Sequence, residues 1–304
     1  MRPTLSVLVP LLALAPPAFA QGADTAQRFN YPPTLCANCI TWNTPHQPQR
    51  IFGNTWYVGT QGLSAILITS RRGHVLIDGA LPVSAPQIIA NIRALGFLVE
   101  DVKVIVNSHA HFDHAGGISA LQRASGASVA VSPKSASVIR SGKPEPSDPQ
   151  FVGGLAFPAT ANVRTIRDGE VIHVGDEPRI ALTAHFTPGH TPGGTSWSWQ
   201  SCDGDTCLHV VYADSQSAIS SDGFLFTNKA TYPDALTDFE RGLSTIERLK
   251  CDVLLTPHPD GSRLFERLAA HGGTAALAEP DGCAQFVTRA REGLAKRIAA
   301  ERKP

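Results

Sequence analysis

The sequence of 304 residues lacks an excess of charge of either sign, since 26 lysine and arginine residues balance 26 aspartate and glutamate residues. This balance gives no electrostatic reason to expect nucleic acid or an anionic membrane surface as a partner. Long charged blocks, low-complexity segments and internal repeats are also lacking, so we expect little disorder away from the chain ends. Hydrophobic residues make up 42% of the chain, enough for the core of one large α/β domain or two small ones.

A hydrophobic run that could comfortably cross a bilayer is lacking as well. The apolar stretch 5–15 is short, is interrupted by Pro10 and follows the positive Arg2. With the small-x-small pattern at 18–20, it is typical of a cleaved signal peptide, whereas the alternative is an apolar N-terminal helix of the fold. We predict a signal peptide at 1–20 and a periplasmic or secreted protein. No cysteine follows the cleavage site, so we expect no lipid or membrane anchor.

Six cysteines agree with export, because an even number can pair fully in an oxidising compartment. Their order along the chain suggests three disulfides: Cys36–Cys39, Cys202–Cys207 and Cys251–Cys283. Two alternatives remain for the first pair. A structural zinc site would need two more ligands, and thiol redox chemistry would need a strand followed by a helix.

Short β-branched runs and amphipathic helical runs alternate along the chain, with glycine and proline between them. An extended N-terminal arm rich in Pro, Asn and Gln is expected at 21–48. We predict strands at 51–58, 64–70, 74–77, 102–106, 127–131, 162–166, 171–174, 180–186, 195–200, 208–212 and 253–255. We predict helices at 82–95, 116–124, 233–249, 262–270 and 283–300. This order indicates two mixed sheets stacked face to face with helices outside, in a single α/β (α+β) domain at 21–304.

A cluster of four possible metal ligands follows the buried strand at 102–106: His109, His111, Asp113 and His114. Alternation places the first two on one side of an extended segment, and a turn can then bring the other two to the same pocket. Imidazole nitrogen and carboxylate oxygen are ligands that zinc prefers. The alternative, a chance run of surface histidines, would not explain four ligands at this spacing.

Two later histidines occupy similar places. His190 and His258 each follow a predicted strand and lie in loops stiffened by proline, Thr-Pro-Gly-His and Thr-Pro-His-Pro. Loops at strand ends commonly carry catalytic groups. A lone histidine is usually structural, and the other six histidines lack this context. Among them His185 is the nearest candidate, because it lies on the strand that leads to His190.

Together these motifs resemble the metallo-β-lactamase superfamily, whose fold is an αββα sandwich with a dinuclear metal site at one edge. Four further segments resemble its class B, subclass B3 β-lactamases: 53–59, 76–79, 212–217 and 251–259. The resemblance implies two Zn²⁺ ions, the first held by His109, His111 and His190 and the second by Asp113, His114 and His258. Ser215 stands where another subclass has a cysteine ligand, as the B3 pattern requires. The Cys251–Cys283 bridge is also shared by members of this subclass.

The resemblance further implies hydrolysis of the β-lactam amide by a metal-bound hydroxide, oriented by Asp113, with no nucleophilic serine. Such an enzyme would confer resistance to β-lactams, carbapenems included, and we expect it to act as a monomer. Ser215 and Ser217 would bind the substrate carboxylate, although by themselves they could be ordinary loop serines. The loop at 147–160 and the segment after Ser217 would form the walls of the substrate-binding groove. Its apolar contacts would be Phe151, Phe157 and Phe224.

Other hydrolases of the superfamily remain alternatives, namely a thioester hydrolase of the glyoxalase II type or a lactonase. In those relatives an aspartate near the position of Asp214 bridges both metals. The placement of Asp214 therefore distinguishes a β-lactamase from these other hydrolases. An alternative of another class is a secreted binding protein that metal stabilises without catalysis. Six ligands of catalytic type argue against it.

Overall fold

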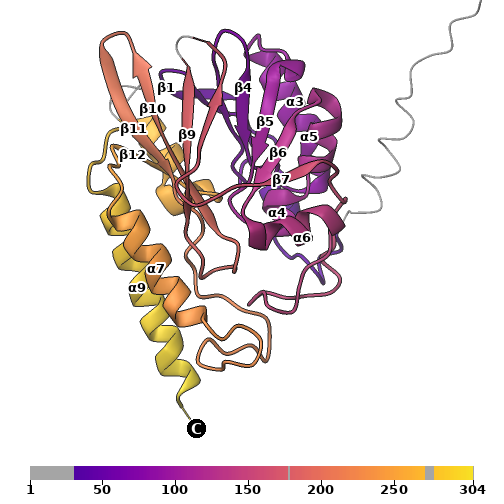
Figure 1. Ribbon diagram of the computed structural model, residues 1–304, viewed down its shortest axis with the longest axis vertical. Coiled ribbons are helices and arrows are strands. Elements are labelled where there is room, and N and C mark those ends of the chain that lie inside the picture. The colour runs from indigo at the N-terminus through magenta and orange to yellow at the C-terminus, as the bar shows by residue number, and fades with distance from the viewer. Residues whose placement is uncertain (1–30, 177–178, 271–276, 304) are drawn as a thin grey trace, which may run out of the picture.

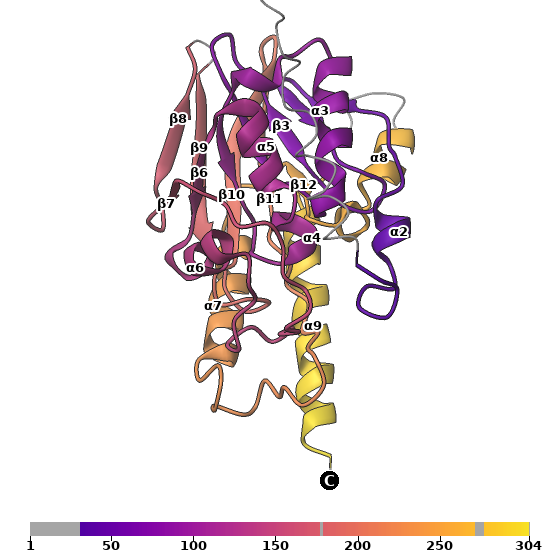
Figure 2. The ribbon, with the colours of Figure 1, turned by 90° about the vertical axis from the view of Figure 1, so that its right-hand side faces the viewer.

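The computed structural model describes residues 31–176, 179–270 and 277–303, so the signal peptide predicted at 1–20 lies outside these ranges. Two β-sheets pack face to face, and helices cover the outer face of each (Figures 1 and 2). This is the αββα sandwich of two mixed sheets that the sequence predicted. Within the arm expected at 21–48, the described part contains a short helix, α2 (Cys39–Trp42).

The first sheet contains seven strands in chain order: β1 (Gln49–Phe52), β2 (Thr55–Tyr57), β3 (Ile66–Ile68), β4 (His74–Ile77), β5 (Val102–Val106), β6 (Ser128–Val131) and β7 (Val163–Thr165). Strands β1 to β4 pair antiparallel, and β4 to β7 pair parallel. The single strand predicted at 51–58 is in fact a hairpin of β1 and β2. Gly53 opens its turn at φ +51°, a conformation that favours glycine.

The second sheet contains five strands in the spatial order β12-β11-β10-β9-β8. Their bounds are β8 (Val171–Val174), β9 (Ile180–Phe186), β10 (Thr195–Asp203), β11 (Thr206–Tyr212) and β12 (Val253–Leu255). Only β11 and β12 pair parallel; the other pairs in this sheet are antiparallel. Fully buried side chains from both sheets meet between them, among them Tyr57, Ile77 and Trp197. This core fixes the two sheets relative to each other.

Helices α3 (Ala85–Ala94), α5 (Ile118–Ser125) and α6 (Pro133–Ser141) cover the first sheet, and α7 (Ala235–Glu247) and α9 (Gly282–Glu301) cover the second. Shorter α8 (Leu264–Ala270) follows β12. Helix α6 was not predicted, because its small polar residues hide the apolar spacing. Local capping explains why it forms: Ser132 Oγ accepts a hydrogen bond from the backbone N–H of Ser135, and Pro133 occupies the first turn.

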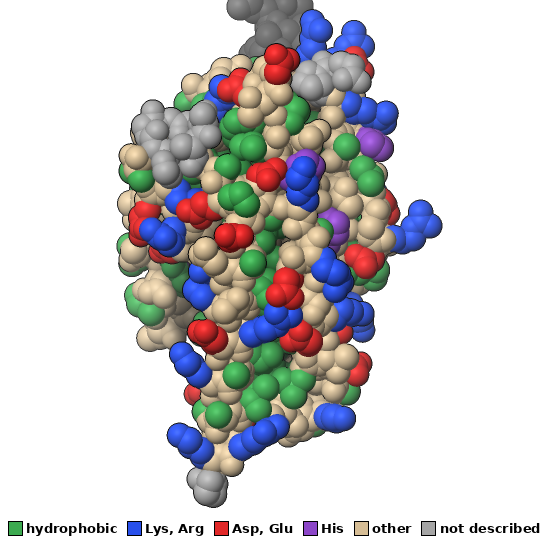
Figure 3. All heavy atoms as spheres, turned by 90° about the vertical axis from the view of Figure 1, so that its left-hand side faces the viewer, with side chains coloured by type: hydrophobic (Ala, Val, Ile, Leu, Met, Phe, Trp, Pro, Cys, Tyr) green, Lys and Arg blue, Asp and Glu red, His purple; other side chains and the backbone are tan. Residues whose placement is uncertain are grey.

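Helices α7 and α9 lie side by side on the outer face of the second sheet. Arg291 of α9 forms ion pairs with Glu240 and Glu247 of α7. Acidic and basic side chains are interspersed on the face shown in Figure 3, as the balanced composition suggested. Within the described residues, no helix has both the length and the apolar character that a membrane span requires.

Three disulfides close segments of the chain: Cys36–Cys39, Cys202–Cys207 and Cys251–Cys283. They are the pairs that the order of the cysteines suggested. The second pairs two residues that lie opposite each other in the β10–β11 hairpin. The third joins the segment before β12 to the first turn of α9, across 32 residues of sequence.

Removing the third disulfide should therefore destabilise the fold more than removing either of the others. Replacing Cys251 and Cys283 together by serine restores the loop entropy of the unfolded chain, and we expect the free energy of unfolding to fall by about 3–4 kcal/mol. Urea denaturation of the oxidised proteins measures the change. The same double replacement at Cys202 and Cys207, which closes a shorter loop, is the control. Equal losses in both variants would contradict the loop-length argument.

Candidate metal centre

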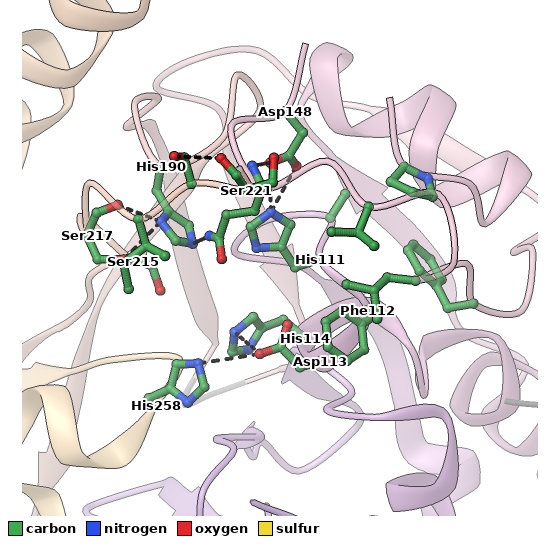
Figure 4. Close-up of a pocket in the computed structure, with 18 of the residues that line it drawn as sticks. His111, Phe112, Asp113, His114, Asp148, His190, Ser215, Ser217, Ser221 and His258 are labelled. Atoms are coloured by element: carbon green, nitrogen blue, oxygen red, sulfur yellow. Dashed lines mark hydrogen bonds and ion pairs between the residues drawn. The ribbon is translucent and has the colours of Figure 1, made fainter. Parts of the chain in front are cut away.

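Four loops from both sheets meet at one edge of the sandwich, the lower edge in Figure 1. They follow the ends of β5, β9, β11 and β12, and they carry His109, His190, Asp214 and His258 respectively. The edge is therefore assembled from segments far apart in sequence. Figure 4 shows the side chains that it brings together.

Six side chains form two groups in which the possible ligand atoms all lie within 4.8 Å of one another. The first group is His109, His111 and His190; the second is Asp113, His114 and His258. In Figure 4, His111 and His190 face Asp113, His114 and His258 across an open space. The rings of His109 and His114 join the two groups, with centroids 4.5 Å apart. The structure thus brings together all six residues that the sequence singled out as ligands.

The local backbone explains how one short segment serves both groups. His111 has extended backbone, and a single helical turn, α4 (Phe112–Ala115), begins directly after it. This turn carries Asp113 and His114 to the second group. Asp113 Oδ2 lies 3.3 Å from His114 Nε2 and 3.4 Å from His258 Nε2. The turn expected at this point is therefore present.

Glycines allow the close approach that packs α4 in place. A Cβ atom on Gly117 would collide with the carbonyl oxygen of Gly79. In return, Gly79 N donates to His114 O at 2.8 Å, and Gly117 N donates to Ala80 O at 3.1 Å. The Gly-Gly pair after the cluster therefore lets the cluster dock against the turn that follows β4.

Three of the histidines are hydrogen-bonded to the protein through Nδ1. His109 Nδ1 donates to Asp214 Oδ1 at 2.7 Å, and both side chains are completely buried. His190 Nδ1 lies 2.9 Å from the carbonyl oxygen of Ser217, and His258 Nδ1 lies 3.0 Å from that of Gly62. A hydrogen bond of this kind fixes the tautomer with the proton on Nδ1, so that Nε2 carries the lone pair that can bind a metal. In the structure, Gln150 Nε2 donates to that lone pair of His190 at 3.1 Å.

Asp214 is a functional residue whose role the sequence analysis left open. It belongs to neither group of possible ligands, and its Oδ1 lies 2.7 Å from His109 Nδ1. A Cβ on Gly194 would collide with Asp214 Oδ2, so glycine makes room for this carboxyl group. In the structure Asp214 orients His109 and does not bridge the two groups.

Asp78 is a second residue that sequence reasoning missed, although the segment 76–79 had been noted. Its buried carboxylate accepts four hydrogen bonds of 2.7–2.8 Å, from Asn107 Nδ2, Ser108 N, Ser108 Oγ and Tyr212 OH. These donors precede His109 and Asp214 in the chain. Asp78 therefore joins the ends of β4, β5 and β11, next to the segments that carry His109 and Asp214.

The residues present fit a metal ion. His109 Nε2 is buried and has no hydrogen-bond partner among the residues that the structure describes, although an orphaned buried nitrogen is costly. Three imidazoles in one group and two imidazoles with a carboxylate in the other are donor sets that suit Zn²⁺. A cation between these atoms would satisfy the orphaned nitrogen.

Electrostatics keep part of each group in the protonation state that metal binding needs, whereas carboxylates raise the pKa of His111 and of His258, Asp148 at the first ring and Asp113 at the second. Burial lowers the pKa of His114 to about 3 and that of His190 to about 4, so both rings are neutral at pH 7. Burial alone would raise the pKa of Asp113, but His114 and His258 hold it below its ordinary value. Neutral imidazoles beside an ionised carboxylate are the forms that bind a metal.

A cavity of about 370 Å³ opens over the two groups, a size that suits a small organic ligand. Ser215, Ser217 and Phe157 line it, as does Trp42 of the N-terminal arm, whose ring packs against His258. Phe151 and Phe224 are not among its lining residues. Phe151 is 37% exposed, and Phe224 packs against Phe226. Trp42 is a wall residue that sequence reasoning missed.

Among the other histidines, His185 bonds to Ser198 Oγ at 2.8 Å and belongs to neither group. His46 stacks on Phe265, and His209 pairs with Asp252. These contacts agree with structural roles. His271 lies outside the described residues.

Comparison with known proteins gives consistent matches. A family model described as the metallo-beta-lactamase superfamily matches residues 58–204. The Rm3 metallo-β-lactamase is 51% identical, with a TM-score of 0.85 and coverage of 88% of this chain and 99% of that one. MEM-A1, a subclass B3 metallo-β-lactamase from a soil metagenome library, is 47% identical, with a TM-score of 0.83 and coverage of 86% and 98%. SMB-1, solved in complex with mercaptoacetic acid, is 41% identical, with a TM-score of 0.81 and coverage of 86% and 99%.

Proposed function

The chain belongs to the metallo-β-lactamase superfamily, and the three solved structures compared with it above are metallo-β-lactamases, of which MEM-A1 is described as subclass B3. From this premise we propose that it is a secreted or periplasmic monomer that hydrolyses β-lactams, carbapenems included, with two zinc ions. The observation that carries the proposal is the pair of three-residue groups facing each other across the cavity. Such an enzyme would confer β-lactam resistance.

The first zinc would be held by His109, His111 and His190, and the second by Asp113, His114 and His258. When bound, two zinc ions supply a water of lowered pKa as the nucleophile and an electrophile for the carbonyl oxygen. The protein contributes Asp113, whose ionised carboxylate can both hold the second ion and accept a hydrogen bond from the attacking water. Hydrogen bonds from His109, His190 and His258 to the protein keep the three rings oriented.

The substrate would bind in the cavity above these groups. Ser215 and Ser217 lie along one wall, where a hydroxyl group can donate to the carboxylate that β-lactams carry. Trp42 and Phe157 supply apolar surface, although Phe157 is only 3% exposed. Phe151, at the exposed rim, would contact only substrates that project out of the cavity.

The three disulfides support an oxidising compartment, because such bonds are rare in the cytosol. They agree with the signal peptide proposed at 1–20. Asp214 in turn favours a β-lactamase over a thioester hydrolase or a lactonase, whose aspartate near this position bridges both metals. Here its carboxyl group lies against His109 Nδ1, outside both groups.

Metal removal tests the proposal. The purified mature protein should contain two zinc ions per chain by elemental analysis and should hydrolyse a chromogenic cephalosporin and a carbapenem. Prolonged dialysis against a chelator should abolish turnover, and added Zn²⁺ should restore it. Mercaptoacetic acid, which SMB-1 binds, should inhibit the zinc-loaded enzyme. Two bound zinc ions without turnover of any β-lactam would contradict the proposed activity. Full activity after complete metal removal would contradict the proposed role of the metal ions.

A further inference from the structure

One loop residue outside the two groups touches a proposed ligand directly. Asp148, in the long segment between α6 and β7, places Oδ1 and Oδ2 at 3.0 and 2.9 Å from His111 Nε2 (Figure 4). The Asp148 side chain is 15% exposed and that of His111 is 14% exposed. The carboxylate therefore accepts a hydrogen bond from His111 in a largely buried position.

This contact settles which nitrogen of His111 faces the metal site. Nε2 is engaged by Asp148, which leaves Nδ1 as the atom available to an ion. In the other three anchored histidines Nδ1 is bonded to the protein. His190 Nε2 also accepts a hydrogen bond from Gln150 Nε2 at 3.1 Å, which agrees with a proton on Nδ1 of that ring. His111 thus donates from Nε2 to a carboxylate that belongs to neither group and that lies in the segment between α6 and β7.

Hydrogen bonds also hold the loop around Asp148 in place. Gln150 N donates to Asp148 Oδ1 at 2.8 Å, which locks the aspartate into a tight local turn. Pro149 O accepts hydrogen bonds from Ser221 N at 2.9 Å and from Ser221 Oγ at 3.2 Å. Ser221 belongs to a second segment that lines the cavity, the one after Ser217. Asp148 is therefore positioned by hydrogen bonds between the two segments that line the cavity, the loop at 147–160 and the segment after Ser217.

The segment after Ser217 is in turn hydrogen-bonded to α9. Arg297 donates to Ser220 Oγ and to the carbonyl oxygen of Phe224, both at 2.7 Å. Glu301 accepts from the backbone N–H groups of Phe226 and Thr227 at 3.0 and 2.9 Å. Hydrogen bonds, together with short stretches of backbone, thus connect the C-terminal helix to His111. They pass through Ser220 and Ser221 and then through Pro149 and Asp148.

We propose that Asp148 is a positioning residue for the first metal site: its carboxylate orients His111 and strengthens that ring as a ligand. This inference rests on the proposed two-zinc function. A carboxylate bonded to the far nitrogen of a ligating histidine fixes the ring and raises its basicity, and loss of such a partner typically weakens metal binding about 10–100-fold. Asp148 acts only through His111.

The test compares zinc binding by the full mature protein and its Asp148 variants. Competition with a chromophoric chelator should give Asp148→Asn and Asp148→Ala a zinc dissociation constant for one of the two sites that is about 10–100-fold higher than in the wild type. Asp148→Glu, which keeps a carboxylate, should recover part of the loss. Glu145→Gln is the matched control, because it removes an acidic group from the same loop without touching His111.

A spectroscopic measurement on the zinc-loaded wild type tests the geometry without any variant. With ¹⁵N-labelled histidine, the His111 ring should show a slowly exchanging Nε2–H proton, assigned by its absence in His111→Ala, and a metal-bound Nδ1. That proton should exchange faster in Asp148→Asn. A wild-type ring that binds zinc through Nε2, or unchanged zinc affinity in Asp148→Asn and Asp148→Ala, would overturn the inference. A wild type that takes up no zinc would instead overturn the proposed function.

Discussion

Replacing Asp113 by asparagine is expected to lower kcat/KM for a chromogenic cephalosporin by about a thousandfold or more, because one change removes two contributions. The amide of asparagine cannot accept a proton from water, and general acid–base catalysis alone is commonly worth about 10²–10⁴-fold. It is also a poor zinc ligand in place of a carboxylate that lies within 3.4 Å of both His114 Nε2 and His258 Nε2. Steady-state kinetics and zinc content, measured together, check both parts.

The zinc content should fall from two ions towards one, since His114 and His258 alone would hold the second ion weakly. Asp222→Asn is the control, because it removes the same charge from an exposed site on the segment beside the cavity. It should leave kcat/KM within about twofold, as exposed charges away from the reacting atoms contribute little. If Asp113→Asn kept two zinc ions and near-normal turnover, the role assigned to Asp113 would be wrong.

The second large effect is expected on stability. Replacing Asp78 by alanine should lower the free energy of unfolding by about 4 kcal/mol or more, since four hydrogen-bond donors lose their shared acceptor in a fully buried place. Each buried donor left without a partner costs about 1–3 kcal/mol. Asp78 also has a φ of +63°, which aspartate tolerates better than alanine. Urea denaturation followed by circular dichroism measures the loss.

Asp78→Asn separates the two causes of that loss. Asparagine keeps one carbonyl oxygen as an acceptor and tolerates the positive φ, so we expect a loss of about half that of alanine. Asp222→Ala, at an exposed position, should change stability by no more than about 0.5 kcal/mol. A loss below about 1 kcal/mol in Asp78→Ala would show that the four hydrogen bonds are not needed to hold the strand ends together.

The parts that could be predicted from the sequence are those with short-range signals. Strands such as 102–106 and 253–255 coincide with β5 and β12, because each is a compact apolar run between turn residues. His190 and His258 could be expected as candidate ligands because they lie in proline-stiffened loops that end strands, whereas the division of the six ligands into two groups followed from the resemblance to metallo-β-lactamases. Their spatial grouping follows from the fold, since strand ends meet at one edge.

The parts that could not be predicted depend on contacts between distant segments. Asp78 bonds to Tyr212 across 134 residues, and Asp214 bonds to His109 across 105. In the sequence, each is one aspartate among many after a strand. Asp148 is harder still, since a polar loop gives no sign that one of its acids turns inward. Helix α6 was missed for a different reason: its capping serine and proline were the available signal, and apolar spacing was not.

Both metal-binding groups draw their ligands from the two halves of the sandwich. His109, His111, Asp113 and His114 follow the first sheet, whereas His190 and His258 follow the second. Each ion would therefore act as a cross-link between the halves, and binding to the folded state alone would stabilise that state in proportion to the logarithm of the free zinc concentration. Zinc supply would thus govern how long the protein survives proteases in a metal-poor compartment, as well as how fast it works. Starving a cell envelope of zinc would then lower the amount of enzyme along with its turnover.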